Sequence, residues 1–319
     1  MASPKGSARY FCRMISWQSS PLTQSGFLFL LFIGLPSLIW GQDWAGQPVP
    51  AEAGPGRVWK LQKELSDDFN YTGKKKRFRK RWQDSYFNKW TGPGLTQWQN
   101  DHSLVENGNL VIRASRRKGT EQVNCGIITG KADLMCPVYT EARIKVSNLE
   151  LSSNFWFLSR DSRREIDVLE VYGGAANDFF AQHMSTNFHV FIRSKATGIT
   201  SNFNDQNHVT LPDSANWRED YHTFGMFWKS PTEIYFYIDG KQLPTGSWEQ
   251  SDMFDKDYTK TPMNKTKYLM DKPLVMILDT EDHHWRSNQG IVAQDSDLAN
   301  PAKNRMLVDW VRTYRLVEK

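Results

Sequence analysis

The chain has 319 residues, in which 40 lysines and arginines face 35 acidic residues, giving a formal charge of +5. Hydrophobic residues make up 39% of it and aromatic residues 13%, which excludes a disordered or collagen-like chain because such chains bury too little apolar surface. With only three cysteines it is not a disulfide-stapled miniprotein. The length suits two average domains, or a single all-β domain of ~200 to 250 residues with extensions.

The N-terminal segment resembles an export signal. Lys5, Arg9 and Arg13 precede the apolar run 27–35, which is followed by Pro36, Ser37 and the small residue Gly41. The run is too short for a membrane-spanning helix, which needs ~20 residues, and the pattern is typical of a secretory signal peptide. A retained anchor or a buried helix is the alternative. We therefore expect residues 1–41 to be removed and the protein to be secreted, without a membrane span in 42–319.

The mature chain shows mostly a two-residue hydrophobic period. Asn107-Gly108 and Asp239-Gly240 are turn pairs that predict hairpins. Residues 138–146 alternate between apolar and polar side chains, which predicts a strand with one buried and one solvated face. Many short strands without an internal boundary predict one antiparallel sandwich domain over 42–319.

Two cysteines remain after the signal. Cys125 and Cys136 flank residues 130–133, which read as a turn. Across a hairpin their spacing would suit a disulfide, and an oxidising compartment would favour one. Two thiols alone do not make a zinc site. We treat the Cys125–Cys136 bridge as an open possibility.

Residues 163–174, RREIDVLEVYGG, contain the closest grouping of potentially catalytic side chains in the sequence. In a regular strand Glu170 would enter the apolar face, where an unpaired carboxylate is very costly. One extra residue near Val168-Leu169, a β-bulge, places Glu165, Asp167 and Glu170 on the same open face.

Three neighbouring carboxylates favour acid–base chemistry. Like charges at short range raise at least one pKa, so one group can stay protonated while another is ionised. Glu165 and Glu170 would be ~13 Å apart at Cα, and side chains leaning inward would approach the ~5 to 5.5 Å carboxyl gap of a retaining glycosidase. An acidic strand that only aids solubility or binds a cation is the alternative.

A sugar-binding cleft also needs aromatic platforms, because the C–H faces of pyranose rings stack on indole and phenol rings. Trp156, nine residues before Glu165 on the preceding predicted strand, is the strongest candidate. The other candidates are Trp90, Trp98, Trp217, Trp228, Trp248 and Trp285. Any one of these alone is more often a core residue.

The block EIDVLE resembles the signature of glycoside hydrolase family 16, and longer blocks such as KWTGPG and LDTEDHHW resemble its β-agarase branch, with β-porphyranases close by. The resemblance covers essentially the whole mature chain. It implies an all-β jelly-roll sandwich of two curved antiparallel sheets with the substrate cleft on the concave face.

The resemblance also implies roles for individual residues. Glu165 would be the nucleophile, Glu170 the general acid/base and Asp167 the supporting carboxylate. Substrate-binding roles would fall on Trp156, His189, Arg193, Glu281 and Trp90. A structural Ca²⁺ would lie near Gly108 and Asp309, although no cation-loop motif marks that place, and catalysis would need no cofactor. His283-His284 is a poor metal pair because adjacent strand residues point to opposite faces.

The resemblance predicts a secreted, endo-acting, retaining β-agarase that cleaves β-1,4 bonds of agarose, with no nucleic acid or membrane partner and as a monomer. A β-porphyranase acting on sulfated agaran and a non-catalytic galactan-binding lectin are the alternatives. The clustered carboxylates speak against the lectin. Arg164, next to Glu165, should point away from the cleft, which favours agarose over a sulfated substrate.

One segment departs from this pattern. Residues 74–81, KKKRFRKR, carry seven positive charges. Such a run is usually a solvated loop, and the sharper hypothesis is that it attracts sulfated galactan, because arginine pairs bidentately with sulfate oxygens much as with phosphate. Without this run and residues 1–41 the chain would be mildly acidic.

Overall fold

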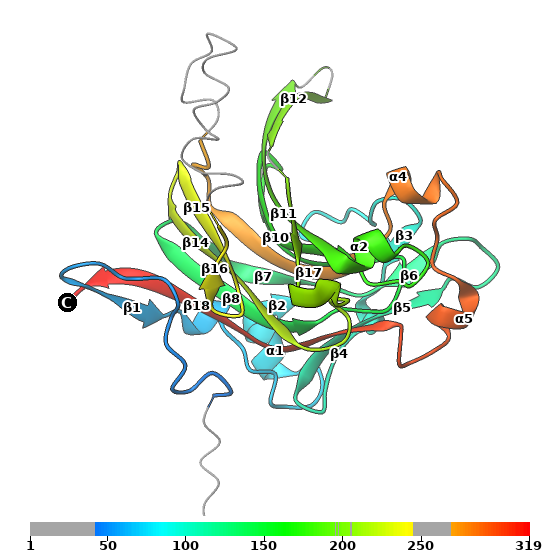
Figure 1. Cartoon of the computed structure of the whole chain (residues 1–319), viewed down its shortest axis with the longest axis horizontal. Coiled ribbons are helices and arrows are strands. Elements are labelled where there is room, and N and C mark those ends of the chain that lie inside the picture. Colours follow the sequence, from blue (N-terminus) through cyan, green and yellow to red (C-terminus); the bar gives the residue numbers. More distant parts are fainter. Residues whose placement is uncertain (1–41, 195, 197, 205, 245–268) are drawn as a thin grey trace, which may run out of the picture. The chain divides into compact units, whose positions relative to one another are not determined.

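The computed structural model describes residues 42–194, 196, 198–204, 206–244 and 269–319, and only these are discussed (Figure 1). The predicted signal peptide and the candidate platform Trp248 lie outside them. None of the helices in the described ranges has the length and apolarity needed to cross a lipid bilayer.

Within these ranges the strands form one sheet of ten and one of eight, antiparallel except for the β3–β6 pair. The first sheet runs β16-β15-β14-β8-β18-β5-β6-β3, with β1 beside β18 and β4 beside β5. Its strands are β1 (Arg57–Leu61), β3 (Thr96–Trp98), β4 (Ser103–Glu106), β5 (Asn109–Arg116), β6 (Val123–Cys125), β8 (Val138–Lys145), β14 (His222–Ser230), β15 (Glu233–Ile238), β16 (Lys241–Gln242) and β18 (Arg305–Glu318).

The second sheet runs β12-β11-β10-β9-β17-β7-β2, with β13 beside β11. Its strands are β2 (Trp82–Gln83), β7 (Ile127–Leu134), β9 (Ser152–Ser159), β10 (Arg164–Tyr172), β11 (His183–Ser194), β12 (Gly198–Asn204), β13 (Asn207–Thr210) and β17 (Leu274–Glu281). Figure 1 shows β11 and β12 curling away from the rest of this sheet. Short helices complete the described fold: α1 (Lys76–Arg81), α2 (Asp178–Gln182), α4 (His284–Ser287) and α5 (Asp295–Leu298).

The main core lies between the two sheets, because alternate residues of their strands meet there. On β9, Phe155 and Phe157 are fully buried in this core, whereas Trp156 belongs to a second cluster on the other face. The same alternation on β17 places Met276 in the core and Ile277 on the opposite face. The second sheet therefore presents one face to the core and the other to the site described below. The predicted two-sheet β sandwich is confirmed.

The turn pairs behave as predicted. Asn107 and Gly108 join β4 to β5 with φ of 52° and 73°, and Asp239 and Gly240 join β15 to β16 with φ of 49° and 73°. Two consecutive positive φ values define the type I′ turn, whose twist matches that of the paired strands.

The predicted turn at residues 130–133 is wrong, and so is the disulfide that depended on it. These residues lie inside β7, which pairs with β17 and, at Gly130, with β2. Cys125 and Cys136 therefore lie beyond opposite ends of an eight-residue strand, and such a strand is ~26 Å long. Both cysteines are free, and Cys125 is buried.

The predicted solvated face of β8 is also partly wrong. Tyr139 and Glu141 are 0% and 2% exposed. Glu141 forms an ion pair with Arg312 of β18, and this guanidinium donates to the backbone oxygens of Gln47 and Pro48 at 2.8 and 3.0 Å. An N-terminal segment thus covers this face, which alternation within β8 alone does not predict.

The basic segment 74–81 is a short helix with its flank rather than a loop. Phe78 of α1 is 1% exposed and anchors the helix in the main core. Lys74 pairs with Asp84 at 2.6 Å, and Arg77 pairs with Asp68. Lys75, Lys76 and Lys80 are exposed. Arg79 and Arg81 donate to the backbone oxygens of Lys74 and Lys63 at 3.0 and 2.8 Å, so four of the seven charges serve the fold.

Candidate active site

A β-bulge in β10 places the acidic residues. Asp167 faces Trp156 of β9, and the next pair on this side is Leu169 with Phe155, so Val168 is the extra residue. The register also shifts toward β11 between Asp167 and Glu170. The predicted bulge is confirmed, and the apolar residues on either side of it are buried in the core.

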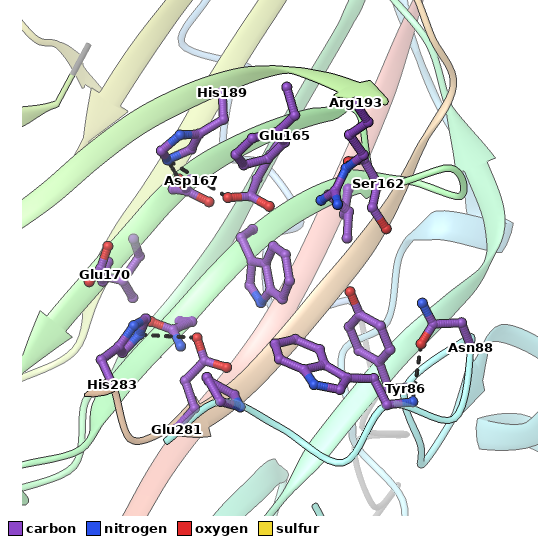
Figure 2. A pocket seen from close by; sticks show the side chains of 17 residues that line it. Tyr86, Asn88, Ser162, Glu165, Asp167, Glu170, His189, Arg193, Glu281 and His283 are labelled. Carbon is purple, nitrogen blue, oxygen red and sulfur yellow. Dashed lines mark hydrogen bonds and ion pairs between the residues drawn. The ribbon is translucent and has the colours of Figure 1, made fainter. Parts of the chain in front are cut away.

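The three carboxylates line one cavity of about 480 Å³ on the outer face of the second sheet (Figure 2). The cavity lies on β9, β10, β11 and β17, and the segment after β2 closes one side. Its lining consists of Tyr86, Asn88, Trp90, Pro93, Asn154, Trp156, Leu158, Ser162, Glu165, Asp167, Leu169, Glu170, His189, Phe191, Arg193, Glu281 and His283. All eight catalytic and substrate-binding residues predicted from the sequence are among them.

At one end of the cavity a single imidazole approaches both Glu165 and Asp167. Nε2 of His189 is 3.4 Å from Oδ2 of Asp167 and 3.8 Å from Oε1 of Glu165. Burial raises the pKa of Glu165 and the charge of Asp167 raises it further, while the charge of His189 opposes both only in part, so that the pKa is raised to about 8. Burial lowers the pKa of His189, but contact with Asp167 and the charge of Glu165 outweigh burial and raise it to about 9. His189 is therefore a cation at neutral pH.

Glu170 lies at the other end with a different set of neighbours. Tyr172 donates a hydrogen bond of 2.9 Å from its hydroxyl to Oε1 of Glu170. Burial raises the pKa of Glu170, and the charge of His283 counteracts part of this effect. His283 lies 3.2 Å from Glu281, and burial lowers its pKa while Glu281 and Glu170 raise it to about 9.

Aromatic rings form one wall of the cavity. Trp156 packs against Tyr86 with ring centroids 6.4 Å apart, and Tyr86 stacks on Trp98 at 5.0 Å. Trp90 meets Tyr86 edge-on at 5.4 Å and is 46% exposed. A wall of this kind offers flat apolar surfaces beside carboxylates, as recognition of sugar rings requires.

The other candidate tryptophans among the described residues do not line the cavity. Trp217 and Trp228 are 1% and 0% exposed in the main core. Trp98 supports the wall from behind, and Trp285, a residue of α4, is 43% exposed. Trp156 is distinguished from these tryptophans by its position within a strand, and the residue type alone does not identify it as a lining residue.

Sequence reasoning missed Tyr86, Asn154, Phe191 and His283 as lining residues. His283 could have been found, because it continues the two-residue period of residues 279 and 281 on the cleft face of β17. Its neighbour His284 points elsewhere and accepts a hydrogen bond from the backbone N–H of Gly94 at 3.2 Å. The expectation that this pair does not form a metal site is consistent with that divergence.

Among the described residues, one group has the ligand types and spacing for a metal ion. The ligand atoms of Glu165, Asp167 and His189 lie within 4.8 Å of one another. A histidine ligand must be neutral to bind a metal, and the raised pKa of His189 opposes this. The arrangement suits a proton-carrying imidazole better than a metal ligand.

The predicted calcium residues lie outside the cavity. Asp309 of β18 accepts a 2.6 Å hydrogen bond from Arg143, and burial together with the nearby charge of Asp43 raises its pKa. The amide of Asn70, beside Gly108, donates to Asp43 at 2.9 Å. The carboxylates of Asp43 and Asp309 are in contact and are the ligand type that a hard divalent cation prefers. Arg143 competes with such a cation for Asp309.

Comparison with protein families places the chain among carbohydrate-active enzymes. A family model described as the GH16 domain of β-porphyranases A–D matches residues 59–316. Beta-agarase AgaB34 of Agarivorans albus is 52% identical over 92% of this chain, and Beta-agarase AgaA of Microbulbifer thermotolerans is 41% identical over 87%. The chain spans 65% and 64% of the lengths of these two relatives. Beta-porphyranase E of Zobellia galactanivorans is 26% identical over 67% of this chain and 73% of its own length.

Solved structures agree with this placement. Beta-agarase A of Zobellia galactanivorans superimposes with a TM-score of 0.77 and 32% identity, covering 88% of this chain and all of that one. An inactivated mutant of beta-agarase B in complex with agaro-octaose gives a TM-score of 0.76 and 33% identity over 87% of this chain and 100% of the other.

Proposed function

The chain belongs to glycoside hydrolase family 16, and we propose that it is a secreted β-agarase that hydrolyses internal β-1,4 galactosidic bonds of agarose with retention of configuration. The relatives of 52% and 41% identity are both β-agarases, and the β-porphyranase is more distant at 26%. The complex of a similar enzyme with agaro-octaose supports an agarose-type substrate.

The bulge in β10 is the observation that carries the proposal. It brings Glu165, Asp167 and Glu170 to one face and surrounds each with a different environment, so that carboxylates of the same type can differ in protonation. The cation His189 near Glu165 lowers a pKa that burial and Asp167 raise, while Glu170 receives a hydrogen bond from Tyr172.

The proposed mechanism assigns one step to each glutamate. Glu170 as an acid protonates the glycosidic oxygen, and the Glu165 carboxylate attacks the anomeric carbon as the bond to the leaving sugar breaks. Water then attacks the glycosyl-enzyme ester while Glu170, now a carboxylate, accepts its proton and Glu165 leaves. Asp167 pairs with His189, whose Nε2 also approaches Glu165, and would hold the imidazolium in place during both steps.

Trp156 and Trp90 would stack on sugar rings, and His189, Arg193 and Glu281 would bind hydroxyl groups. Arg193 is held by the bond from its Nε to the backbone oxygen of Ser162 at 2.6 Å, which leaves the rest of its guanidinium beside the cavity. We infer no cofactor for catalysis.

We further propose that residues 1–41 direct secretion and are removed, and that the mature protein is a monomer. The basic n-region, the short apolar run and the small-residue exit support export. A structural calcium ion bound by Asp309, the backbone of Gly108 and Asp43 would stabilise the sheet distant from the cavity. The contact between two carboxylates supports this site, and a rise in melting temperature with Ca²⁺ that is lost in Asp309→Asn would test it.

A β-porphyranase is the second candidate, since the matching family model is that of β-porphyranases A–D and Arg193 lines the cavity. Arg164 does not contribute. Its side chain is 8% exposed and its Nε lies 2.9 Å from Asp271. This fits the expectation that it points away from the cavity. A lectin without turnover is disfavoured because closely packed carboxylates raise one another's pKa without helping to bind a neutral sugar.

Release of reducing ends from agarose, porphyran and carrageenan, measured side by side, tests the proposal. We expect agarose to be the best substrate and the first product to be the β-anomer. An initial α-anomer would contradict retention, and preference for porphyran would favour the second candidate. Glu165→Gln and Glu170→Gln should each abolish turnover and retain binding, and wild-type turnover in either would overturn the catalytic assignment.

A further inference from the structure

A carboxylate that does not line the cavity lies directly beneath its aromatic wall. Asp279 of β17 is 0% exposed. Its Oδ1 accepts a hydrogen bond of 2.8 Å from Nδ2 of Asn154, and its Oδ2 accepts one of 3.1 Å from Nε1 of Trp156. Both donors line the cavity and Asp279 does not.

Strand register makes this arrangement a property of the sheet. Asp279 faces Asn154 across the β9–β17 pair, and Trp156 faces Asp167 across the β9–β10 pair. Trp156 therefore lies between the buried carboxylate on one side and the supporting carboxylate of the proposed catalytic group on the other. A change in the orientation of the Trp156 ring would therefore change the surroundings of Asp167.

Packing alone leaves the orientation of Trp156 incompletely determined. Its ring is near-parallel to that of Tyr86, at 28° and 6.4 Å, and a stacked indole can present either edge to a given side while keeping its contact area. The bond from Nε1 to Asp279 selects one edge. Ser152 donates to Oδ1 of Asn154, so the amide of Asn154 is also held in one orientation, with its NH₂ group toward Asp279.

Burying the carboxylate of Asp279 costs folding free energy, so the identity of its two hydrogen-bond donors points to a role for this residue. Burial and the charge of Glu281 raise the pKa of Asp279 well above its usual value, and an apolar residue at this position of β17 would avoid the desolvation cost. The side chain of Asp279 accepts its hydrogen bonds from Asn154 and Trp156, which both line the cavity.

We propose that Asp279 is a positioning residue for substrate binding, which acts through Trp156 and Asn154 without touching the sugar. The inference rests on the proposed function and adds to it a residue that orients the aromatic platform.

Asp279→Asn tests the proposal. The amide offers one acceptor and places an NH₂ group against the second donor, so one of the two bonds is lost at nearly constant volume. A misoriented platform weakens binding of substrate and transition state alike. We expect KM for agarose to rise about 3- to 10-fold, the value of one aromatic contact, while kcat changes less than about twofold. An unchanged KM would overturn the proposal.

Asp67 provides a matched control away from the cavity. It is 2% exposed and accepts hydrogen bonds from Nε1 of Trp82 at 3.0 Å and the hydroxyl of Tyr71 at 2.8 Å. Asp67→Asn should lower the melting temperature and leave KM unchanged. An equal rise in KM in both variants would show that loss of stability, and not positioning, causes the effect.

Trp156→Phe removes the donor of the hydrogen bond between Trp156 and Asp279. It provides the test of the proposal if the Asp279→Asn variant does not fold. It keeps a ring and removes the N–H, so KM should also rise. In the double variant the two effects on KM should be less than additive, because both variants disturb the orientation of the same indole ring. Full additivity would overturn the proposal.

A measurement without substrate separates this inference from the proposed function. In ¹⁵N spectra the indole N–H signal of Trp156, assigned by its loss in Trp156→Phe, should shift and exchange faster with D₂O in Asp279→Asn. If the wild-type protein releases no reducing ends from any galactan, the proposed function fails while this signal still decides the inference. An unmoved, equally protected signal would overturn it.

Discussion

Nε2 of His189 lies 3.4 Å from the carboxylate of Asp167. The same nitrogen is 3.8 Å from the carboxylate of Glu165. One imidazole therefore lies within 4 Å of two carboxylates that are two residues apart on β10. Like charges this close oppose each other's ionisation. A protonated His189 in contact with both lowers the pKa of Glu165, the proposed nucleophile, against the larger effects of burial and Asp167, which raise it.

His189→Gln should move the acidic limb of the pH–rate profile upward. The groups that face Glu165 are Asp167, His189, Glu281 and Glu170, and His189 is the cation among them. A nearby opposite charge lowers a carboxyl pKa, so its removal raises the pKa of Glu165 and the nucleophile ionises only at higher pH. We expect a shift of ~1 pH unit in kcat/KM measured on agarose.

His183→Gln is the matched control, because His183 begins the same strand but packs on Phe179 at 4.0 Å, and it does not line the cavity. Its acidic limb should coincide with that of the wild type. An acidic limb that stays in place in His189→Gln would show that His189 does not set the ionisation of Glu165.

His283→Gln should move the alkaline limb upward. Glu170 faces His283, Asp167, Tyr172 and Glu281, and the charge of His283 lowers its pKa. Without this cation Glu170 keeps its proton to higher pH, so the general acid survives further into the alkaline range. His284→Gln, on the neighbouring residue with its bond to Gly94, should leave the limb unchanged. A downward shift in His283→Gln would contradict the assignment of Glu170 as the acid.

Local sequence predicted those parts of the fold that depend on neighbouring residues. The bulge follows from the conflict between the polarity of Glu170 and regular alternation, and the hairpins follow from turns that need positive φ. Residues 130–133 have the composition of a turn, but pairing with β2 and β17 extends them. The burial of Glu141 depends on residues 47 and 48, which are distant in sequence.

The candidate site shows the same division. EIDVLE and the preceding strand identified Glu165, Asp167, Glu170 and Trp156 because their spacing along a strand fixes the face they share. Tyr86 reaches the cavity from an irregular segment after β2, for which a repeating pattern gives no direction. Asp279 was not recognisable either, since its role depends on contacts with another strand.

The buried pair of Glu141 and Arg312 should contribute strongly to stability when one partner is removed. Both side chains are 2% exposed, and an uncompensated buried charge costs about 3 to 5 kcal/mol. Arg312→Met should reduce the free energy of unfolding by this amount, measured in urea, without altering KM. Glu141→Leu combined with Arg312→Met should recover most of the loss.

The exposed pair Lys229–Glu233 is the control, since its side chains are 47% and 27% exposed. Glu233→Gln should change the free energy of unfolding by about 1 kcal/mol or less. If Arg312→Met costs no more than this, the N-terminal segment is not held by the buried pair.

The exposed lysines of the basic segment should affect sulfated galactans selectively. Lys75, Lys76 and Lys80 do not line the cavity and carry charge into solvent. Their combined replacement by glutamate should weaken retention of the protein in porphyran-containing gels at low salt, because attraction between exposed charges is screened as salt rises. Hydrolysis of neutral agarose should not change. Equal retention of the wild-type protein and the variant in porphyran would contradict the hypothesis that this segment attracts sulfated galactan.

The free cysteines predict insensitivity to reductant. Residues 42–319 contain Cys125 and Cys136, and burial raises the pKa of both thiols, which disfavours the reactive thiolate. Cys125 should react with a thiol reagent only after unfolding, and the urea-unfolded protein should titrate as two thiols. The melting temperature should be the same with and without dithiothreitol. Zero thiols in urea would demand a bridge across the two ends of β7, a distance of ~26 Å, and would therefore show that β7 is not the continuous strand described above.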